Sequence, residues 1–377
     1  MTHYTFALIG AGMAGASAGY FLAEHGPLLL LEREDMPGYH TTGRSAAIYS
    51  ETYGNATIRA LTSGGRDFFT APPQGFTEVP LLTPRGALFI GRSDQQDALE
   101  RTAREGAELV PSVRRIEAAE ACALVPVLRQ DYVAGAVLEP DATDMDVNAI
   151  HQGFLRGLRA RGGEIVTRAA VERLERAQGL WRIATSAGEF TADVLINAAG
   201  AWGDELAGLA SAAPVGLVPK RRTAITLPAP DGAGDLDAWP LTIDVDEQFY
   251  FKPEAGHLLA SPADETPMPP CDVQPEELDI AILVDRLQQA TSLNVPRIER
   301  RWAGLRSFVA DKSPVVGFDP ACEGFFWLVG QGGYGIQTAP SMGRVAAALA
   351  REQEVPTDLR QWGVAASALS PARFTGD

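Results

Sequence analysis

The sequence has few cysteines, few histidines and no long apolar run. The 377 residues include only three cysteines, Cys122, Cys271 and Cys322, and five scattered histidines. Neither a disulfide framework nor a metal centre is therefore expected. No apolar run approaches the roughly 20 residues that span a bilayer, and the first residues lack the basic and apolar regions of a secretion signal. We expect a cytoplasmic protein without an integral membrane segment.

Positive charge is scarce relative to negative charge. The chain has 32 lysines and arginines against 48 aspartates and glutamates, which gives a formal net charge of −16. A field of that sign repels nucleic-acid phosphates and anionic lipid headgroups, so neither is expected as a partner. Hydrophobic residues make up 46% of the chain, which is ordinary for a globular protein, and the length suits two intertwined domains.

A glycine-rich turn connects two predicted elements near the start of the chain. The apolar run 6–9 reads as a buried strand, 10–15 reads GAGMAG, and the alanine-rich stretch 16–25 reads as a helix. A second apolar run, 28–31, ends on Glu32. The segment therefore has the strand–turn–helix–strand order of a dinucleotide-binding unit.

The chemistry of dinucleotide binding requires glycine at three places in this turn. Gly10 makes the tight turn, Gly12 admits a pyrophosphate to the backbone amides, and Gly15 allows the helix to pack closely. Glu32 lies 22 residues after Gly10, where an acid that accepts from ribose hydroxyls is expected. The sequence thus predicts a bound dinucleotide.

A loop of small residues follows, where a nicotinamide-binding protein would continue with another strand and helix. The stretch 35–47 is rich in glycine, threonine, serine and alanine. Such a loop can wrap a long flat ligand, which favours FAD. The alternative is that Thr41, Thr42 and Ser45 are ordinary turn and capping residues.

The rest of the chain predicts two interleaved domains. An amphipathic helix over 148–161 and apolar strands over 194–196 and 325–329 belong with the dinucleotide-binding unit. Short strand-like pieces between prolines and glycines predict a separate mixed sheet. The expected fold is α/β: a Rossmann-like FAD-binding domain of the glutathione-reductase type with an interleaved α+β substrate domain on a mixed β-sheet. The predicted FAD-binding domain comprises 1–75, 146–215 and 300–377, and the substrate-binding domain 76–145 and 216–299.

A second glycine loop, 330–335, follows the predicted strand 325–329 and leads into an expected helix over 336–352. A helix N-terminus carries partial positive charge. Facing the pyrimidine edge of a flavin, it would stabilise negative charge on the reduced ring. A second phosphate loop or a plain tight turn is the alternative.

Several runs resemble one family of flavoenzymes. The run 38–47, GYHTTGRSAA, resembles the flavin loop of the D-amino-acid oxidase family of FAD oxidoreductases, and within it the bacterial D-arginine dehydrogenases. The runs 197–202, 219–222, 246–253, 302–311 and 331–338 fit the same family. The resemblance implies a non-covalently bound FAD, because the nearest candidate for covalent attachment, Cys322, lies in a stretch that reads as a turn.

The resemblance also implies which residues contact the cofactor, and it implies no metal ligands. These residues lie in the first glycine turn, the flavin loop, and the runs near 171, 200, 304 and 333. They are Gly10, Gly12, Met13, Ala14, Gly15, Glu32, Arg33, His40, Thr42, Gly43, Arg44, Ser45, Ala46, Ala47, Val171, Ala199, Gly200, Trp202, Gly304, Gly330, Gly332, Gly333, Tyr334, Gly335, Ile336 and Gln337.

An amino-acid substrate requires a clamp for its carboxylate, and arginine supplies two parallel donors in a fixed geometry. By resemblance, Arg222 and Arg306 take this role and Tyr250 contacts the same carboxylate. Tyr53 matches a tyrosine on a mobile loop, and the Gly333 carbonyl accepts from the substrate amine. Core packing is the alternative for both tyrosines.

The implied reaction is oxidative deamination of D-amino acids to 2-oxo acids and ammonia, by hydride transfer from Cα to flavin N5. The electrons then pass to an acceptor that the sequence does not identify, a quinone or another compound, with oxygen left open. Two alternatives are oxidation of N-methyl or secondary amino acids and D-arginine dehydrogenation proper. A third alternative is a flavin module that acts on RNA or on a partner protein. The net charge of −16 disfavours RNA, and the set of Arg222, Tyr250 and Arg306 favours a small carboxylate.

Two positions depart from the D-arginine dehydrogenase pattern. Ala87 stands where the resemblance places the acid that holds the guanidinium group, and Ile48 stands where it places a histidine. Both changes make the predicted substrate pocket, which also includes Ser50 and Gln337, more apolar. An enclosed cation without its carboxylate partner is penalised by roughly 3–5 kcal/mol, so a preference for apolar side chains is expected. The alternative is that Glu51 or another nearby acid replaces the missing one.

Overall fold

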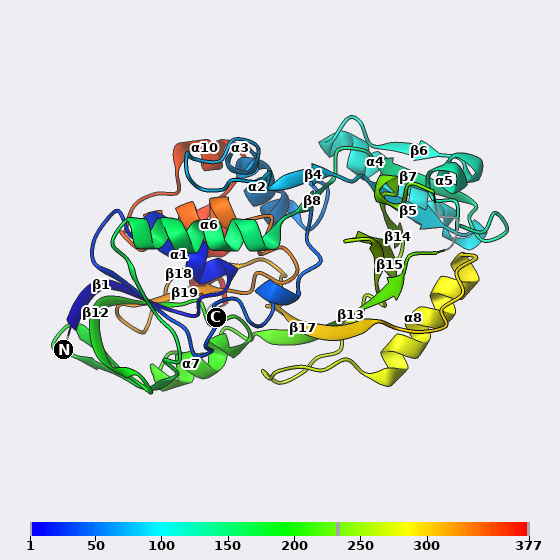
Figure 1. Ribbon diagram of the computed structural model, residues 1–377. Coiled ribbons are helices and arrows are strands. Elements are labelled where there is room, and N and C mark those ends of the chain that lie inside the picture. Colours follow the sequence, from blue (N-terminus) through cyan, green and yellow to red (C-terminus); the bar gives the residue numbers. More distant parts are fainter. Residues whose placement is uncertain (1, 231–233, 375–377) are drawn as a thin grey trace.

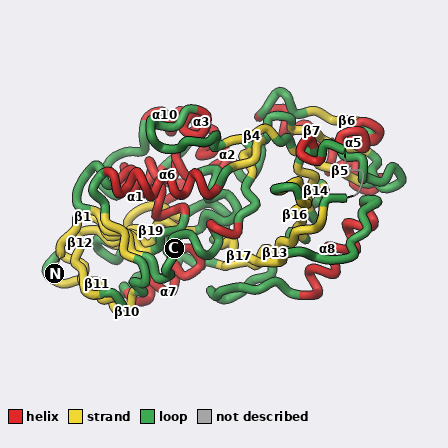
Figure 2. Tube along the Cα trace, in the orientation of Figure 1, coloured by secondary structure: helices red, strands yellow, loops and turns green. Residues whose placement is uncertain are grey.

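The computed structural model describes residues 2–230 and 234–374, and within these ranges the strands form three sheets (Figures 1 and 2). The first sheet has five parallel strands at its centre, in the order β19, β12, β1, β2 and β9. Antiparallel strands extend it beyond β12 and β19. Its strands are β1 (Thr2–Ile9), β2 (Leu28–Leu31), β9 (Glu164–Val166), β10 (Val171–Ala177), β11 (Leu180–Thr185), β12 (Gly188–Asn197), β18 (Val315–Phe318) and β19 (Phe325–Val329).

Strand β1 is buried on both faces, as a central parallel strand must be. Phe6 and Leu8 belong to one core, and Ala7 and Ile9 belong to the other. Three helices cover the first face: α1 (Met13–Leu22), α6 (Val147–Ala160) and α9 (Ala339–Leu349) (Figure 1). The other face packs against the β10–β11 hairpin and α7 (Gly203–Leu209).

Most of the predicted elements of this unit are confirmed. The apolar stripe of the helix predicted over 148–161 is buried against α1. The strand predicted over 325–329 has the predicted bounds, and the one predicted over 194–196 is the end of the longer β12. The helix predicted over 336–352 is shorter, because 334–338 form turns and Thr338 caps α9.

The second sheet is mixed and has eight strands among the described residues, as predicted for the second unit. Among the strands that the structure describes in this sheet, only the pair β5–β14 is parallel. One face packs on α5 (Ala118–Leu124) and α8 (Glu277–Ala290). On the other face, the part around β5 and β7 packs on α4 (Gln96–Leu109), and the part around β13 and β17 is turned toward the first unit (Figure 1). In spatial order, its strands are β17 (Arg300–Phe308), β13 (Val218–Pro228), β16 (His257–Ser261), β15 (Tyr250–Glu254), β14 (Leu241–Asp244), β5 (Ala87–Gly91), β7 (Gly135–Glu139) and β6 (Arg114–Ile116).

Strand β17 lies in this second sheet although the predicted boundary at residue 300 assigns it to the FAD-binding domain. It pairs with β13 along nearly its whole length, so its position is set by backbone hydrogen bonds to the substrate side. The domain boundaries themselves stay a prediction. The turn-rich stretch 228–237, which the sequence predicts to be a surface loop, includes residues 231–233, and these lie outside the described residues.

A third, small sheet joins the two units and carries the segment that leads to Tyr53. It consists of β3 (Ile48–Tyr49), β8 (Thr143–Met145) and β4 (Leu82–Pro84). The remaining helices are α2 (Ala56–Gly64), α3 (Arg66–Thr70), α10 (Thr357–Gln361) and α11 (Ala366–Leu369).

Candidate active site

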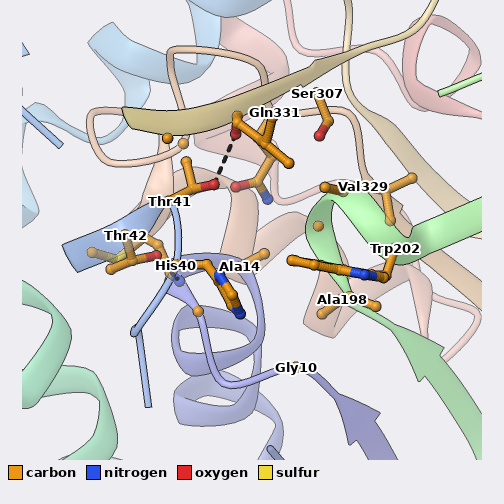
Figure 3. Close-up of a pocket in the computed structure, with 18 of the residues that line it drawn as sticks. Gly10, Ala14, His40, Thr41, Thr42, Ala198, Trp202, Ser307, Val329 and Gln331 are labelled. Carbon is orange, nitrogen blue, oxygen red and sulfur yellow. Dashed lines mark hydrogen bonds between the residues drawn. The ribbon is translucent and has the colours of Figure 1, made fainter. Parts of the chain in front are cut away.

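A cavity of about 510 Å³ lies where the first sheet meets the second. On the first sheet it begins at the carboxyl ends of β1, β2, β12 and β19, the edge at which open α/β sheets bind ligands. On the second sheet it reaches β13, β15 and β17. Figure 3 shows Trp202, Ala198 and Val329 on one side of the cavity and Thr41, Thr42 and His40 on the other.

The first glycine turn forms the floor of the cavity. Gly10 has a φ of +105°, and a Cβ there would lie 2.5 Å from the Ala198 carbonyl oxygen. Gly12 lines the cavity at the start of α1. Because the first turn of a helix leaves its N–H groups without intrahelical partners, this end of α1 presents donors and partial positive charge to the cavity.

Glu32 supports this turn from the end of β2. It is 8% exposed, and its Oε2 accepts a hydrogen bond from the Ala11 amide at 2.9 Å. It also lines the cavity. The carboxylate therefore fixes the turn and still has lone pairs available to ribose hydroxyls.

The flavin loop is tied to both units. Thr42 Oγ1 accepts from the Met13 amide at 3.0 Å, and Thr41 Oγ1 donates to the Leu305 carbonyl at 2.7 Å, the contact dashed in Figure 3. Arg44 donates to Asp272 Oδ1 at 2.5 Å. These contacts hold the loop over the cavity between α1 and β17.

A cluster of rings closes the cavity beyond β12. The Arg33 guanidinium stacks 3.9 Å from the Trp202 ring centroid, and the His40 ring lies 4.7 Å from the same indole. His40 Nε2 also contacts Glu34 Oε1 at 2.9 Å. Asn197 fixes the turn before Trp202, since its amide donates to the Gly203 carbonyl at 2.8 Å. The flat walls made by these rings suit a planar ligand.

Arg306 is the cavity's unpaired cation. It projects from β17 into the cavity, and among the described residues no carboxylate lies within ion-pair distance of it. Within the part of the chain that the structure describes, its guanidinium makes one hydrogen bond, to the Tyr53 hydroxyl at 3.5 Å. Burial alone would lower the pKa of Arg306, but the nearby Tyr53 and Tyr250 hydroxyls raise it above its ordinary value. The guanidinium therefore stays charged and has donors to spare.

Arg222 and Arg221 face opposite sides of β13. Arg222 lines the cavity but is already engaged, because it donates to the Asp264 carbonyl and pairs with Glu265 at 3.3 Å. Arg221 is held on the other side by Asp264 and by two acids of the α8 region. Of the four cavity arginines, Arg33 pairs with Glu34 and Arg44 pairs with Asp272. Within the described residues, only Arg306 is thus free of a protein carboxylate.

The structure brings most of the predicted site residues together around this one cavity. The predicted residues that line it are Gly10, Gly12, Met13, Ala14, Glu32, Arg33, His40, Thr42, Arg44, Ser45, Ala46, Ala47, Val171, Ala199, Gly200, Trp202, Arg222, Tyr250, Gly304, Arg306, Gly330, Gly332, Gly333, Gly335 and Ile336.

Four predicted cofactor residues lie behind this lining. A Cβ at Gly15 would lie 1.9 Å from the Gly10 carbonyl oxygen, so this glycine serves packing. The Gly43 amide donates to the Gly38 carbonyl within the loop. The ring of Tyr334 packs against that of Tyr53, with the ring centroids 4.8 Å apart. Gln337 is buried, and its amide donates to the Thr62 hydroxyl. Their predicted contact with the cofactor stays a prediction.

The predicted substrate residues Tyr53, Ile48, Ser50 and Ala87 also lie outside the lining. Tyr53 reaches the site through Arg306. Ile48 pairs with Asp144 in the third sheet, and Ser50 donates to Glu139. Ala87 is 2% exposed and stands directly across from Glu139. Glu51, proposed above as a replacement acid, is turned toward Tyr49, Ser63 and Arg66 instead.

Sequence reasoning missed several lining residues. Thr41, Ala198, Ser307 and Gln331 each sit next to a predicted residue in a run already singled out. These four residues could therefore have been predicted from their neighbours. No sequence feature pointed to Ala224: it lies two residues after Arg222 on β13, and its position in the lining follows only once the side of the strand that faces the cavity is known.

Comparison with known proteins identifies the family. Residues 6–349 match the model of the DAO family, described as FAD dependent oxidoreductase. The chain belongs to this family. The predicted fold class and the FAD cofactor are thereby confirmed, and the resemblance seen in the sequence is confirmed at the level of the family.

Relatives within the family act on several amines. Glycine oxidase of Geobacillus kaustophilus is 22% identical over 373 residues, which cover 95% of this chain and 96% of that protein. Its crystal structure superposes with a TM-score of 0.82 at 19% identity, over 97% of this chain and 99% of that one. Monomeric sarcosine oxidase of Bacillus sp. is 26% identical over 209 residues, 54% of this chain and 53% of that protein.

The residues of the cavity fit FAD. The Gly10–Gly12 turn and the α1 N-terminus would hold the pyrophosphate, Glu32 the ribose, and the glycine loop 330–335 the flavin end. None of the three cysteines lines the cavity, and Cys322 Sγ points to the Ala210 carbonyl. Non-covalent binding stays a prediction. Among the described residues no helix has the length and apolar character of a membrane span.

His151, which contacts the glycine turn, makes the stability of the folded state depend on pH. It is buried on α6, and its Nε2 donates to the Ala11 carbonyl at 2.8 Å. Burial lowers its pKa, and the Ala11 carbonyl opposes this shift only in part. The folded state therefore binds fewer protons than the unfolded chain once the pH falls below about 6.5, so stability is lost as the pH falls through that value.

We expect His151→Gln, which keeps a donor near Nε2 but does not titrate, to flatten this loss. Thermal unfolding at neutral and mildly acidic pH would measure it. The control is His257→Gln, at an exposed histidine on the second sheet. Equal acid sensitivity of the wild type and His151→Gln would contradict the assignment.

Proposed function

We propose that this protein oxidises D-amino acids to 2-oxo acids and ammonia. The observation that carries the proposal is Arg306, a charged guanidinium that lines the FAD cavity without a carboxylate partner among the described residues. Arg306 is half-buried, a charge removed from water without a partner is costly, and a planar fork of donors matches a carboxylate. An amino-acid carboxylate supplies the missing partner.

The chain's own groups then orient the substrate. Arg306 binds the carboxylate, and the half-buried Tyr250 on the neighbouring part of the inner face donates to it. The Gly333 backbone lies against the Arg306 guanidinium, where a Cβ would approach it to 2.8 Å. By the resemblance, the Gly333 carbonyl accepts from the substrate amine. The bound flavin supplies the hydride acceptor for the substrate Cα. The amine must be neutral when the hydride leaves.

The D configuration and a preference for apolar side chains rest on the resemblance. The flavin loop GYHTTGRSAA supports the first, and Ala87 in place of the guanidinium-binding acid supports the second. The electron acceptor is a quinone or another compound, with oxygen open.

Secondary amines are the second candidate. The support for it is that monomeric sarcosine oxidase, whose named substrate is an N-methyl amino acid, is among the relatives. Both candidates use the same carboxylate clamp and differ only at the amine.

A substrate panel separates the candidates. The holoprotein is mixed anaerobically with D-leucine, D-methionine, D-arginine, L-leucine, sarcosine and proline, and loss of the oxidised-flavin absorption band is followed. We expect fast bleaching by D-leucine and D-methionine and slow bleaching by D-arginine and L-leucine. Bleaching by sarcosine or proline alone would support the second candidate and contradict the first.

The side-chain pocket has its own test at position 87. We expect Ala87→Glu to raise the bleaching rate with D-arginine relative to D-leucine by about tenfold or more, because it adds a carboxylate for the guanidinium. The uncharged variant Ala87→Gln is the matched control and should leave the ratio near that of the wild type. If the glutamate variant keeps the wild-type preference, the pocket does not include position 87.

A further inference from the structure

Glu139, at the end of β7, is a buried carboxylate without a cation. It is 2% exposed, and among the described residues it takes part in no ion pair. Two other acids in buried parts of the same unit are paired: Asp144 with Arg85 and Lys252, and Asp264 with Arg221. An unpaired buried carboxylate is unfavourable for stability, which points to another role for Glu139.

Both carboxylate oxygens of Glu139 accept hydrogen bonds from hydroxyl groups of one loop. Ser50 Oγ donates to Oε1 at 2.9 Å, and Thr52 Oγ1 donates to Oε2 at 2.7 Å. The two hydroxyl oxygens are themselves 3.0 Å apart. Ser50 and Thr52 belong to the loop 50–55 between β3 and α2. Glu139 thus fastens this loop to the second sheet, 87 and 89 residues away in the sequence.

The same loop carries Tyr53 to the carboxylate clamp. The Tyr53 hydroxyl lies 3.5 Å from Arg306 Nη1, and its ring packs on Tyr334. At the other end of the loop, Asn55 donates to Ser313 at 3.0 Å and caps α2. The loop is therefore held at both ends, by Glu139 on the substrate side and by Asn55 on the side of the first unit.

We propose that Glu139 is a positioning residue for substrate binding: it holds the loop 50–55 so that Tyr53 stands against Arg306. This deepens the proposed function and rests on it for the role of Arg306. A carboxylate suits the task because its two oxygens accept from two hydroxyls at once, whereas a shorter or apolar side chain leaves both hydroxyls without their buried acceptor.

The surroundings of Glu139 are acidic rather than basic. Burial raises its pKa, the Thr52 and Ser50 hydrogen bonds oppose the rise, and Asp141 and Glu51 add to it. A glutamine at this position keeps the length and one carbonyl acceptor, and its amide can donate to a hydroxyl. Glu139→Gln should therefore hold the loop, whereas Glu139→Ala should release it.

The test is a double-mutant cycle with Tyr53 in the holoprotein. The dissociation constants of D-leucine and D-arginine and the limiting bleaching rate are measured anaerobically for Glu139→Ala, Tyr53→Ala, their combination and Glu139→Gln. We expect Glu139→Ala to weaken D-leucine about tenfold, with a smaller effect on the limiting rate, and Glu139→Gln to stay within about threefold. In the Tyr53→Ala background, removing Glu139 should add less than about twofold, because coupled residues are not additive. Asp141→Asn is the control, because this exposed acid also lies near Glu139 but, among the described residues, its side chain accepts its one hydrogen bond from Ser112 and none from the loop 50–55.

A second readout does not depend on any substrate. Hydrogen exchange of the amides of 50–55 should speed up in Glu139→Ala and not in Asp141→Asn. If Glu139→Ala fails to fold, the pair Ser50→Ala and Thr52→Val removes the same bonds from the loop side.

Three results would overturn the proposal. The first is unchanged exchange in 50–55. The second is an equal loss of affinity with and without Tyr53. The third is a loss confined to D-arginine, which would make Glu139 a side-chain binding residue instead. A wild-type flavin that no amino acid bleaches would contradict the proposed function, and the exchange measurement would still decide the role of Glu139 in holding the loop.

Discussion

Replacing Arg306 by leucine should weaken binding of the amino-acid substrate by about two to three orders of magnitude, the effect of losing one partner of a buried charge pair. Arg306 is the one cavity arginine without a protein carboxylate among the described residues, so no neighbouring group takes over its role. Arg306→Lys should recover only part of the loss, because an ammonium keeps the charge but not the planar pair of donors. The concentration dependence of anaerobic flavin bleaching gives the dissociation constants.

The matched control for this substitution is on the same strand. Arg301 on β17 is exposed and pairs with Glu277, and exposed pairs contribute little. Arg301→Leu should leave substrate binding unchanged. If Arg306→Leu binds D-leucine as tightly as the wild type, the carboxylate clamp is elsewhere.

The second large effect is expected in the glycine turn, where two neighbouring glycines should fail in different ways. Gly12 has an ordinary extended backbone (φ −72°, ψ −171°), and a Cβ there meets only Thr42 Oγ1, at 3.3 Å. Gly12→Val should therefore fold, but its side chain occupies the path of the pyrophosphate. With the charge-assisted bonds from the backbone amides lost, FAD affinity should fall by roughly two orders of magnitude.

Gly15→Ala is the contrasting variant. Its Cβ would lie 1.9 Å from the Gly10 carbonyl oxygen and 3.2 Å from a methyl group of Leu30, so the turn itself must shift. We expect a melting temperature lower by a few degrees even without FAD, together with weaker FAD binding. Flavin fluorescence titration and thermal unfolding of the apoproteins separate the two cases. Gly12→Val that binds FAD normally would contradict the placement of the cofactor.

The parts of the fold that the sequence predicted are those controlled by local chemistry. The strand, the glycine turn and Glu32 are close together in the chain. Together their residue types and spacing are characteristic of a dinucleotide-binding unit. The stripe of α6 was visible for the same reason, since 3.6-residue periodicity requires no knowledge of the partner. The start of α9 was misplaced because the prediction did not use Pro340, which is tolerated in the first turn of a helix and so indicates a start near Ala339.

The substrate side was predicted less completely because it depends on contacts between distant segments. Arg306 was identified as a candidate. Nothing in the sequence shows, however, that Arg222 forms an ion pair with Glu265 whereas Arg306 has no carboxylate partner among the described residues. The pairing of Glu139 with Ser50 joins residues 89 apart. The prediction for position 87 compared one residue with the D-arginine dehydrogenase pattern and did not consider its neighbours. In the fold, Ala87 lies directly across from the buried Glu139.

The central claim is that the substrate is held by its carboxylate at Arg306 beside the flavin. It is tested most directly by comparing D-leucine with D-leucinamide, which has the same amine, Cα and side chain but no negative charge. Anaerobic mixing with the wild-type holoprotein should bleach the flavin with D-leucine, and D-leucinamide should require a concentration about a hundredfold higher or more. Equal bleaching by the acid and its amide would contradict the claim.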